Sequence, residues 1–170
     1  MSDKKVFDFK GRDIEVHWDG RLCIHIAECG ESEGDLFVGG RDPWCVPDTS
    51  NPDEVAEICA RCPSGALSYT DKSGKSEQVE SENSVQVTYN GPLYVQGELT
   101  IEGIPNDMPS TRFRAALCRC GLSKNKPFCD NSHLEPPFED YGAVGNKGPG
   151  NTSNTGPLNI KPAKDGPLIL

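Results

Sequence analysis

The sequence predicts an α+β fold built as two small domains, and three observations support this prediction. Residues 5–22 alternate apolar and polar side chains as a strand hairpin does, with turn residues at Gly11 and at 19–20. Asn51 and the proline after it then mark the start of a helix. A polar stretch without periodicity, residues 71–84, follows. The predicted division is a domain at 1–70, a linker at 71–84 and a second domain at 85–170.

The first domain is expected to contain a hairpin, a helix and a closing strand. The hairpin strands read VFDFKG and DIEVHWDG, and His17 in the second of them is expected to face solvent. Asn51 is the predicted N-cap, Pro52 takes the first helical position, and the helix is expected to end near Ala60. Residues 67–69 then return as a strand, which completes a strand-helix-strand unit.

The second domain is expected to be rich in strands. The stretch SVQVTYNGPLYVQGELTIEG predicts two strands around an Asn90-Gly91 turn, and FRAALCRCG predicts a strand that runs into a cysteine pair. The tripeptide Gly-Pro-Leu stands at 91–93 and returns at 156–158 and 166–168. This repetition predicts that the C-terminal tail comes back to pair with the strands of 85–101.

The composition limits both the core and the class of partner. Hydrophobic residues are 35% of the 170, while 18 glycines and 14 prolines favour turns, so a large apolar core is not expected. The net charge is -9, and residues 1–80 hold 17 acidic against 9 basic side chains. This acidity disfavours a nucleic-acid partner and is typical of a solvated surface or of a docking face for a basic redox partner.

The eight cysteines are expected to serve metal binding rather than to form the disulfide scaffold of a secreted protein. The N-terminus MSDKKVFDFKGRD lacks the apolar segment of a signal peptide, and no stretch is apolar enough to cross a membrane. The expected location is therefore the reducing cytoplasm, where disulfides are rare. Metal centres would also supply stability that a small core lacks.

Residues 118–133 read CRCGLSKNKPFCDNSH and place three thiols and one imidazole in one loop. Thiolate and imidazole are the ligands that soft and borderline metals select. The one-residue gap between Cys118 and Cys120 suits two thiolates on one iron, whereas zinc sites usually leave about two to four residues between paired cysteines. Iron-sulfur is therefore favoured, and a zinc-binding interaction module is the alternative.

This loop resembles the cluster-binding loop of the CDGSH iron-sulfur domain, the mitoNEET-like family. The matching positions are Cys118, Cys120, Ser123, Pro127, Cys129, Asp130, Ser132 and His133. Asn131 stands where the family usually has Gly, and Asn tolerates a positive φ better than most residues. The resemblance implies a β-rich cradle with a cluster-binding loop and a short helix, in a monomer or a strand-swapped homodimer. It also implies a [2Fe-2S] cluster bound by Cys118, Cys120, Cys129 and His133.

A second group of cysteines lies between residues 23 and 62. Cys23 and Cys29 are close in sequence, and Cys62 precedes a proline that ends a helix and fixes the following turn. The segment 7–67 resembles the divergent 4Fe-4S mono-cluster domain, a ferredoxin-like α+β domain that often accompanies CDGSH domains in bacteria. The matching positions are Cys23, His25, Cys29, Pro43, Trp44 and Cys62 to Leu67. The resemblance implies a second iron-sulfur cluster on Cys23, Cys29 and Cys62.

The fourth ligand of this second cluster has several candidates. Three thiolates satisfy a [3Fe-4S] cluster, while His25, Cys45 or Cys59 could complete a [4Fe-4S] cluster. His25 is favoured because it belongs to the matching pattern, and its alternative role is a hydrogen bond to a cluster sulfur. Cys45 and Cys59 could instead be buried thiols, or face each other as a disulfide.

Two clusters in one small chain predict an electron carrier between a reductase and an acceptor enzyme. The histidine ligand takes up protons near neutral pH, so a cluster transfer, storage or redox-sensing module, with an apo iron-sulfur protein as partner, is the alternative. Arg119, Lys124 and Lys126 could offset the charge of an added electron. The sequence contains no recognisable nucleophile and base pair or phosphate loop, so an enzyme is not expected.

Overall fold

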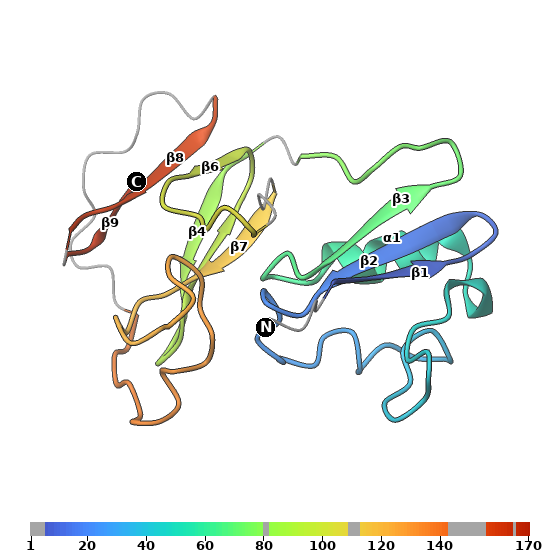
Figure 1. Cartoon of the computed structure of the whole chain (residues 1–170), viewed down its shortest axis with the longest axis horizontal. Helices are drawn as coiled ribbons and strands as arrows, with labels where there is room; N and C mark the ends of the chain where they lie inside the picture. Colours follow the sequence, from blue (N-terminus) through green and yellow to red (C-terminus); the bar gives the residue numbers. More distant parts are fainter. Residues whose placement is uncertain (1–5, 80–81, 109–112, 143–155, 165) are drawn as a thin grey trace. The chain divides into compact units, whose positions relative to one another are not determined.

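The computed structural model describes residues 6–79, 82–108, 113–142, 156–164 and 166–170. The chain divides into two compact units, Met1–Gln78 and Val79–Leu170, and each is described by itself (Figure 1). The strands outnumber the helices in both, which agrees with an α+β fold. No helix in the described ranges is long and apolar enough to span a membrane.

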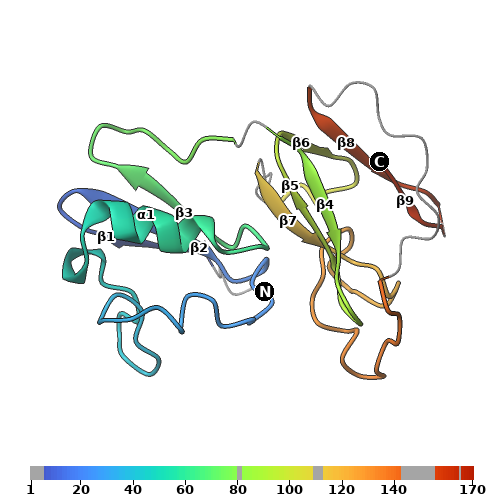
Figure 2. The ribbon, with the colours of Figure 1, turned by 180° about the vertical axis from the view of Figure 1, so that it is seen from behind.

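The first unit is an antiparallel sheet with a helix across one face. Its strands β1 (Val6–Lys10), β2 (Ile14–Asp19) and β3 (Leu67–Asp71) lie in the order β1-β2-β3, and α1 (Pro52–Ala60) covers them (Figure 2). A short 3-10 helix, η1 (Pro47–Thr49), precedes α1. The predicted hairpin, helix and closing strand are all present.

Alternation along the strands decides which face is buried. In β2, Ile14 and Val16 are buried and pack in one core cluster with Val55 and Ile58 of α1. A chain of aromatic side chains runs from this cluster outwards, with ring centroid distances of 5.2–5.7 Å; its members are Phe37, which belongs to the cluster, and Trp44, Phe9, Trp18 and Phe7. Rings packed edge to face or tilted add stability beyond the area they bury.

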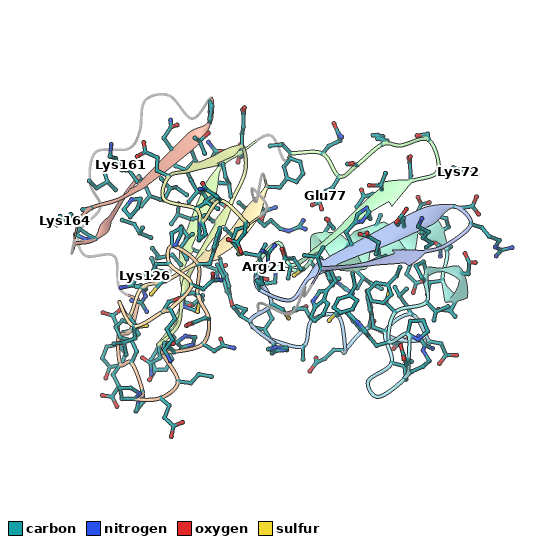
Figure 3. The ribbon with its side chains drawn as sticks, viewed as in Figure 1. Arg21, Lys72, Glu77, Lys126, Lys161 and Lys164 are labelled. Atoms are coloured by element: carbon teal, nitrogen blue, oxygen red, sulfur yellow. The ribbon has the colours of Figure 1, made fainter. Side chains whose placement is uncertain are left out.

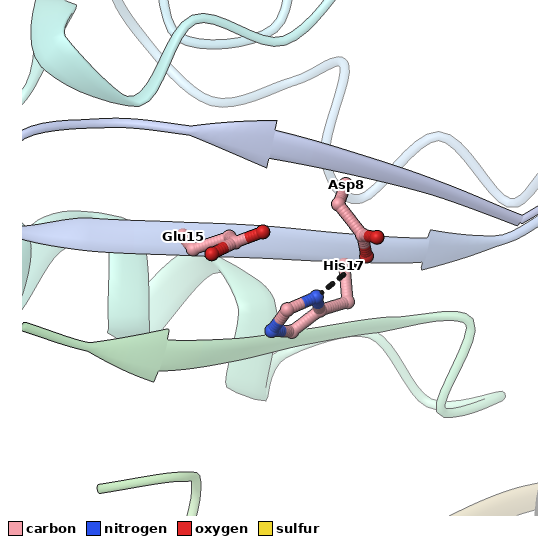
Figure 4. Close-up of side chains that lie close together, drawn as sticks. All are labelled: Asp8, Glu15 and His17. Carbon is pink, nitrogen blue, oxygen red and sulfur yellow. Dashed lines mark hydrogen bonds and ion pairs between the residues drawn. The ribbon is translucent and has the colours of Figure 1, made fainter. Parts of the chain in front are cut away.

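His17 is on the opposite face of β2, and its environment differs from the prediction. The side chain is only 33% exposed, because Nδ1 lies 2.8 Å from Asp8 Oδ1 on β1 and Nε2 lies 3.0 Å from Thr70 Oγ1 on β3. Glu15 stands beside it on the same face (Figure 4). Because both ring nitrogens already have protein partners, His17 ties the three strands together rather than simply facing solvent.

The predicted linker is ordered where it begins. Lys72 donates its backbone N-H to the carbonyl of Asp13 at 2.9 Å, and its Nζ lies 2.8 Å from the Asp13 carboxylate. Lys72 directly follows β3 and is labelled beside the end of that strand in Figure 3. The Asp71 carboxylate accepts the N-H groups of Ser73 and Lys75, a turn pattern that short polar residues favour. Residues 71–76 are therefore a turn on the first unit.

The second unit contains two small sheets. Strands β4 (Ser84–Val87), β5 (Leu93–Gln96) and β7 (Arg114–Leu117) form an antiparallel sheet in the order β4-β5-β7. Strands β6 (Leu99–Ile101), β8 (Leu158–Pro162) and β9 (Leu168–Ile169) form the other, in which β8 is parallel to β6. The tail therefore returns to the 85–101 strands, as the Gly-Pro-Leu repetition predicts.

Two details of the second unit differ from the prediction. The second strand of the expected hairpin is interrupted at Gly97, where φ is +128 and a Cβ would lie 2.8 Å from Asn83 Cα, so it splits into β5 and β6. The expected short helix is absent from the described residues of this unit. Residues 132–137 form turns instead, closed by N-H bonds from Leu134 to Asn131 and from Phe138 to His133.

The cap of α1 provides a test of the first unit. Asn51 Oδ1 accepts the N-H of Glu54 at 2.9 Å, and we expect Asn51→Ala to lower the free energy of unfolding by about 1 kcal/mol. Asn51→Asp keeps an acceptor at the same position and should lose much less. Urea unfolding followed by circular dichroism measures both, and equal losses would mean that the cap is not the cause.

Candidate metal centres

The loop from Cys23 to Cys29 is bent by two left-handed residues. His25 has φ +52 and Ala27 has φ +68, although neither is a glycine. The bend is fixed by the Ala27 carbonyl, which accepts N-H groups from Gly30 at 2.8 Å and Glu31 at 3.0 Å. Left-handed backbone in a side-chain-bearing residue is uncommon and concentrates at binding sites.

This loop and the turn after α1 enclose a cavity of about 240 Å³. The volume lies below the range of about 300–1,000 Å³ that organic ligands occupy, and so suits a compact inorganic centre. Its walls include Trp18, Phe37 and Trp44. Its thiol- and imidazole-bearing residues are the four that the sequence predicts as ligands, namely Cys23, His25, Cys29 and Cys62.

The donors of this cavity are near one another. Cys23 Sγ lies 3.7 Å from His25 Nδ1. Burial raises the pKa of the Cys29 thiol, and the neighbouring Cys23 and Cys62 thiols raise it further. A bound soft cation would offset the cost of ionising these buried thiols, because a thiol loses its proton when its sulfur binds a metal. The donor chemistry therefore fits a metal centre.

Cys45 and Cys59 are placed differently from these four. They are 1% and 0% exposed, belong to the hydrophobic core, and do not line the cavity. Burial raises the pKa of Cys45 to about 12, as expected of a thiol in apolar surroundings. The eight cysteines, all within the described ranges, form no disulfide, so the possible Cys45-Cys59 bridge is not formed.

The second unit gathers its four predicted donors at the end of β7. Cys118 Sγ is 3.9 Å from Cys120 Sγ, and Cys129 Sγ is 3.4 Å from His133 Nδ1. Two backbone bonds hold the arms of the loop together, from Cys118 N-H to the Pro127 carbonyl and from Cys129 N-H to the Ala116 carbonyl, both 2.8 Å. The loop is thus an extension of the sheet.

Backbone N-H groups point at the sulfurs of this loop. Leu122 N lies 3.4 Å from Cys120 Sγ, and Asn131 N lies 3.5 Å from Cys129 Sγ. Burial raises the pKa of Cys118, and the backbone N-H groups of Ser123 and Gly121 oppose that rise. Such donors stabilise sulfur that carries negative charge. Asn131 has φ +68, which confirms the conformation anticipated for it.

Ser123 and Asp130 keep the loop closed. Ser123 Oγ donates to the Phe128 carbonyl at 2.6 Å and accepts the N-H of Asn125 at 3.0 Å. The Asp130 carboxylate accepts N-H groups from Lys124 and Ser132 at 2.9 and 3.0 Å. Burial alone would raise the pKa of Asp130, but its hydrogen bonds together lower it. The loop is therefore built around an ionised carboxylate.

Arg119 has a role that the sequence did not reveal. Its guanidinium donates to the carbonyls of Gly91 at 2.9 Å and Thr88 at 2.6 Å, pairs with the Asp140 carboxylate, and lies 4.9 Å from the Phe138 ring centre. Its donors are thus directed to the β4-β5 turn and to residues 138–140. Lys124 and Lys126 are exposed, and Figure 3 marks Lys126 on the ligand loop.

Two gathered sets of thiol and imidazole donors define a protein with two candidate soft-metal centres. Residues 9–72 match the family described as "Divergent 4Fe-4S mono-cluster", and residues 90–134 match "Iron-binding zinc finger CDGSH type". The chain also resembles "Uncharacterized protein YjdI" of Escherichia coli strain K12 and its counterpart in strain O157:H7. Each is 36% identical over 64 residues, which cover 38% of this chain and 84% of the relative.

The chain therefore belongs to the divergent 4Fe-4S mono-cluster family, and a CDGSH-type domain follows within the same chain. Both domains are iron-sulfur-binding types. No solved structure matches the chain.

The Arg119 contacts predict that removing Arg119 destabilises the second unit more than removing Lys124, a basic residue of the same loop. We expect Arg119→Ala to lower the unfolding free energy of the second unit by about 2 kcal/mol, because charge-assisted bonds to the β4-β5 turn are lost. Lys124→Ala removes the same charge from an exposed side chain and is the matched control. Thermal unfolding of the metal-loaded variants measures the loss of stability in each. Equal losses would mean that the Arg119 contacts do not stabilise the second unit.

Proposed function

We propose that this protein is an electron carrier with two iron-sulfur centres. In the second unit, Cys118, Cys120, Cys129 and His133 would hold a [2Fe-2S] cluster. In the first unit, Cys23, Cys29 and Cys62 would hold a [4Fe-4S] cluster with His25 as fourth ligand, or a [3Fe-4S] cluster without it. The observation that carries the proposal is that each unit brings its soft donors to one place, with every one of these thiols partly or fully buried.

The residues around the donors suit electron transfer. A bound iron-sulfur cluster supplies a one-electron couple. The N-H groups of Leu122 and Asn131 are fixed by the loop, so they stabilise added negative charge without rearrangement. Among the residues that the structure describes, no nucleophile with a base and oxyanion donors lies beside either donor set, and we place the protein among carriers rather than enzymes.

The partner we favour presents a basic face. Every charged side chain between residues 22 and 40 is acidic, and all of these are exposed; they are Glu28, Glu31, Glu33 and Asp35. Glu28 also lines the cavity of the first unit. Opposite charges on a redox partner would speed its approach, and the effect would weaken with salt.

Cluster transfer, storage or sensing is the second candidate, and His133 is the observation in its favour. His133 is partly exposed and is followed by Leu134, which is 65% exposed, so the imidazole lies at the edge of the ligand loop. Imidazole is the one ligand that takes up a proton near neutral pH and leaves the metal. An apo iron-sulfur protein would then be the partner. A zinc-binding module uses the same donors, but would be colourless.

The carrier function is tested on protein purified without oxygen. We expect about five or six iron atoms per chain, one-electron reduction with dithionite, and reoxidation by cytochrome c, a basic acceptor, at a rate that falls as salt is added. Iron should remain bound after repeated cycles. Loss of iron to an apo-ferredoxin within the same cycles would favour transfer instead, and a colourless protein would leave only zinc.

The ligand role of His133 is tested by His133→Cys. A thiolate keeps the metal at mildly acidic pH where imidazole is protonated, so we expect slower bleaching of the [2Fe-2S] absorption in that range. His17→Cys changes an imidazole away from both donor sets and is the control. Equal bleaching rates in wild type and His133→Cys would remove His133 from the ligand set.

A further inference from the structure

Ser64 is a buried hydroxyl inside the first-unit donor site. It is the second residue after Cys62, lines the same cavity, and is only 2% exposed. The turn that carries it is fixed at both ends. Gly65 donates its N-H to the Cys62 carbonyl at 3.3 Å, and the Ala66 carbonyl accepts the N-H of Asp19 at 2.9 Å. A hydroxyl buried this way must use its hydrogen-bonding capacity within the protein.

The contacts of Ser64 determine where its proton points. Its Oγ accepts the N-H of Ala66 at 3.3 Å and lies 3.6 Å from Cys62 Sγ. Among the described residues, these are the two recorded partners of the side chain. Because the Ala66 contact uses an oxygen lone pair, the hydroxyl proton is left for the sulfur. A metal-bound thiolate has no proton of its own, so the direction of the bond is then O-H to sulfur.

We propose that Ser64 is a positioning residue that raises the reduction potential of the first centre. The inference rests on the proposed function, because it requires a cluster on Cys62. Reduction adds one electron and no atom, and the serine proton stays on Oγ. The added charge makes the Cys62 sulfur a stronger acceptor, so the hydrogen bond stabilises the reduced state more than the oxidised one.

The second centre serves as an internal control for the change in reduction potential. The sulfur contacts described there come from backbone N-H groups of residues such as Leu122 and Asn131, which a side-chain substitution leaves in place. Ser64, in contrast, is a side-chain donor that evolution or mutation can remove without changing the backbone. The potential of the first centre can therefore be adjusted independently of the second.

The test is a reductive titration of Ser64→Ala followed by EPR, on holo protein with a prior iron and sulfide count. We expect the equilibrium constant for reducing the first centre to fall by up to roughly tenfold, which is about 59 mV for one electron. The second centre should not move. Ser64→Thr keeps the hydroxyl and should retain the wild-type value. Ser32→Ala is the matched control, because Ser32 Oγ donates at 2.7 Å to the Cys29 carbonyl rather than to a sulfur.

The possible results distinguish the role of Ser64 from the proposed function. An intact first centre with an unchanged potential in Ser64→Ala would overturn the role of Ser64 alone. A wild-type first unit without iron would overturn both this inference and the proposed function. If the alanine variant loses its cluster, pulsed EPR of the reduced wild type in D2O decides. A deuteron coupled to the first centre supports the hydrogen bond, and the absence of any exchangeable coupled proton contradicts it.

Discussion

Thiols that lie close together cannot all ionise without cost, and both units are arranged around this constraint. Burial disfavours the ionised form of Cys29, Cys118 and Cys129 alike, so the pKa of each is raised. The protein keeps the thiols close nevertheless, using backbone geometry rather than positive side chains. The protonated form of these thiols is therefore favoured, and a soft metal that binds the sulfurs would displace the protons.

The two units meet the constraint by different means. The first closes a cavity with left-handed residues, aromatic walls and the buried hydroxyl of Ser64. The second extends a sheet into a loop and directs N-H groups at its sulfurs, with an ionised Asp130 at the base. The two donor sets therefore differ in their surroundings: apolar walls and a side-chain hydroxyl surround the first, and backbone N-H groups surround the second.

Much of the fold could be predicted from residues that are close together in the sequence. Asn51 and Pro52 predict the start of α1 because capping depends on neighbouring residues, and the hairpin follows from alternation and turn residues. The grouping of the candidate donors could also be predicted, because metal-ligand residue types and their spacing can be seen in the sequence, and their role as ligands stays a prediction. In the second unit, the return of the tail could be anticipated from the repeated Gly-Pro-Leu, although its parallel pairing with β6 could not.

What could not be predicted depends on contacts between distant segments. The pair of Arg119 with Asp140 and the His17 contacts to β1 and β3 arise only after folding. The split at Gly97 depends on Asn83, which lies directly before β4. The role of Ser64 was missed for another reason. Its position beside Cys62 is visible in the sequence, but its burial is not.

The parallel pairing of β8 with β6 sets an order in which the protein can mature. The first unit is complete once residue 78 has been made, whereas the β6-β8-β9 sheet of the second requires residues 158–162, which follow His133 by more than twenty positions. During synthesis on the ribosome, the first unit can fold early, while this sheet of the second waits for a strand not yet translated. The two units would then fold one after the other.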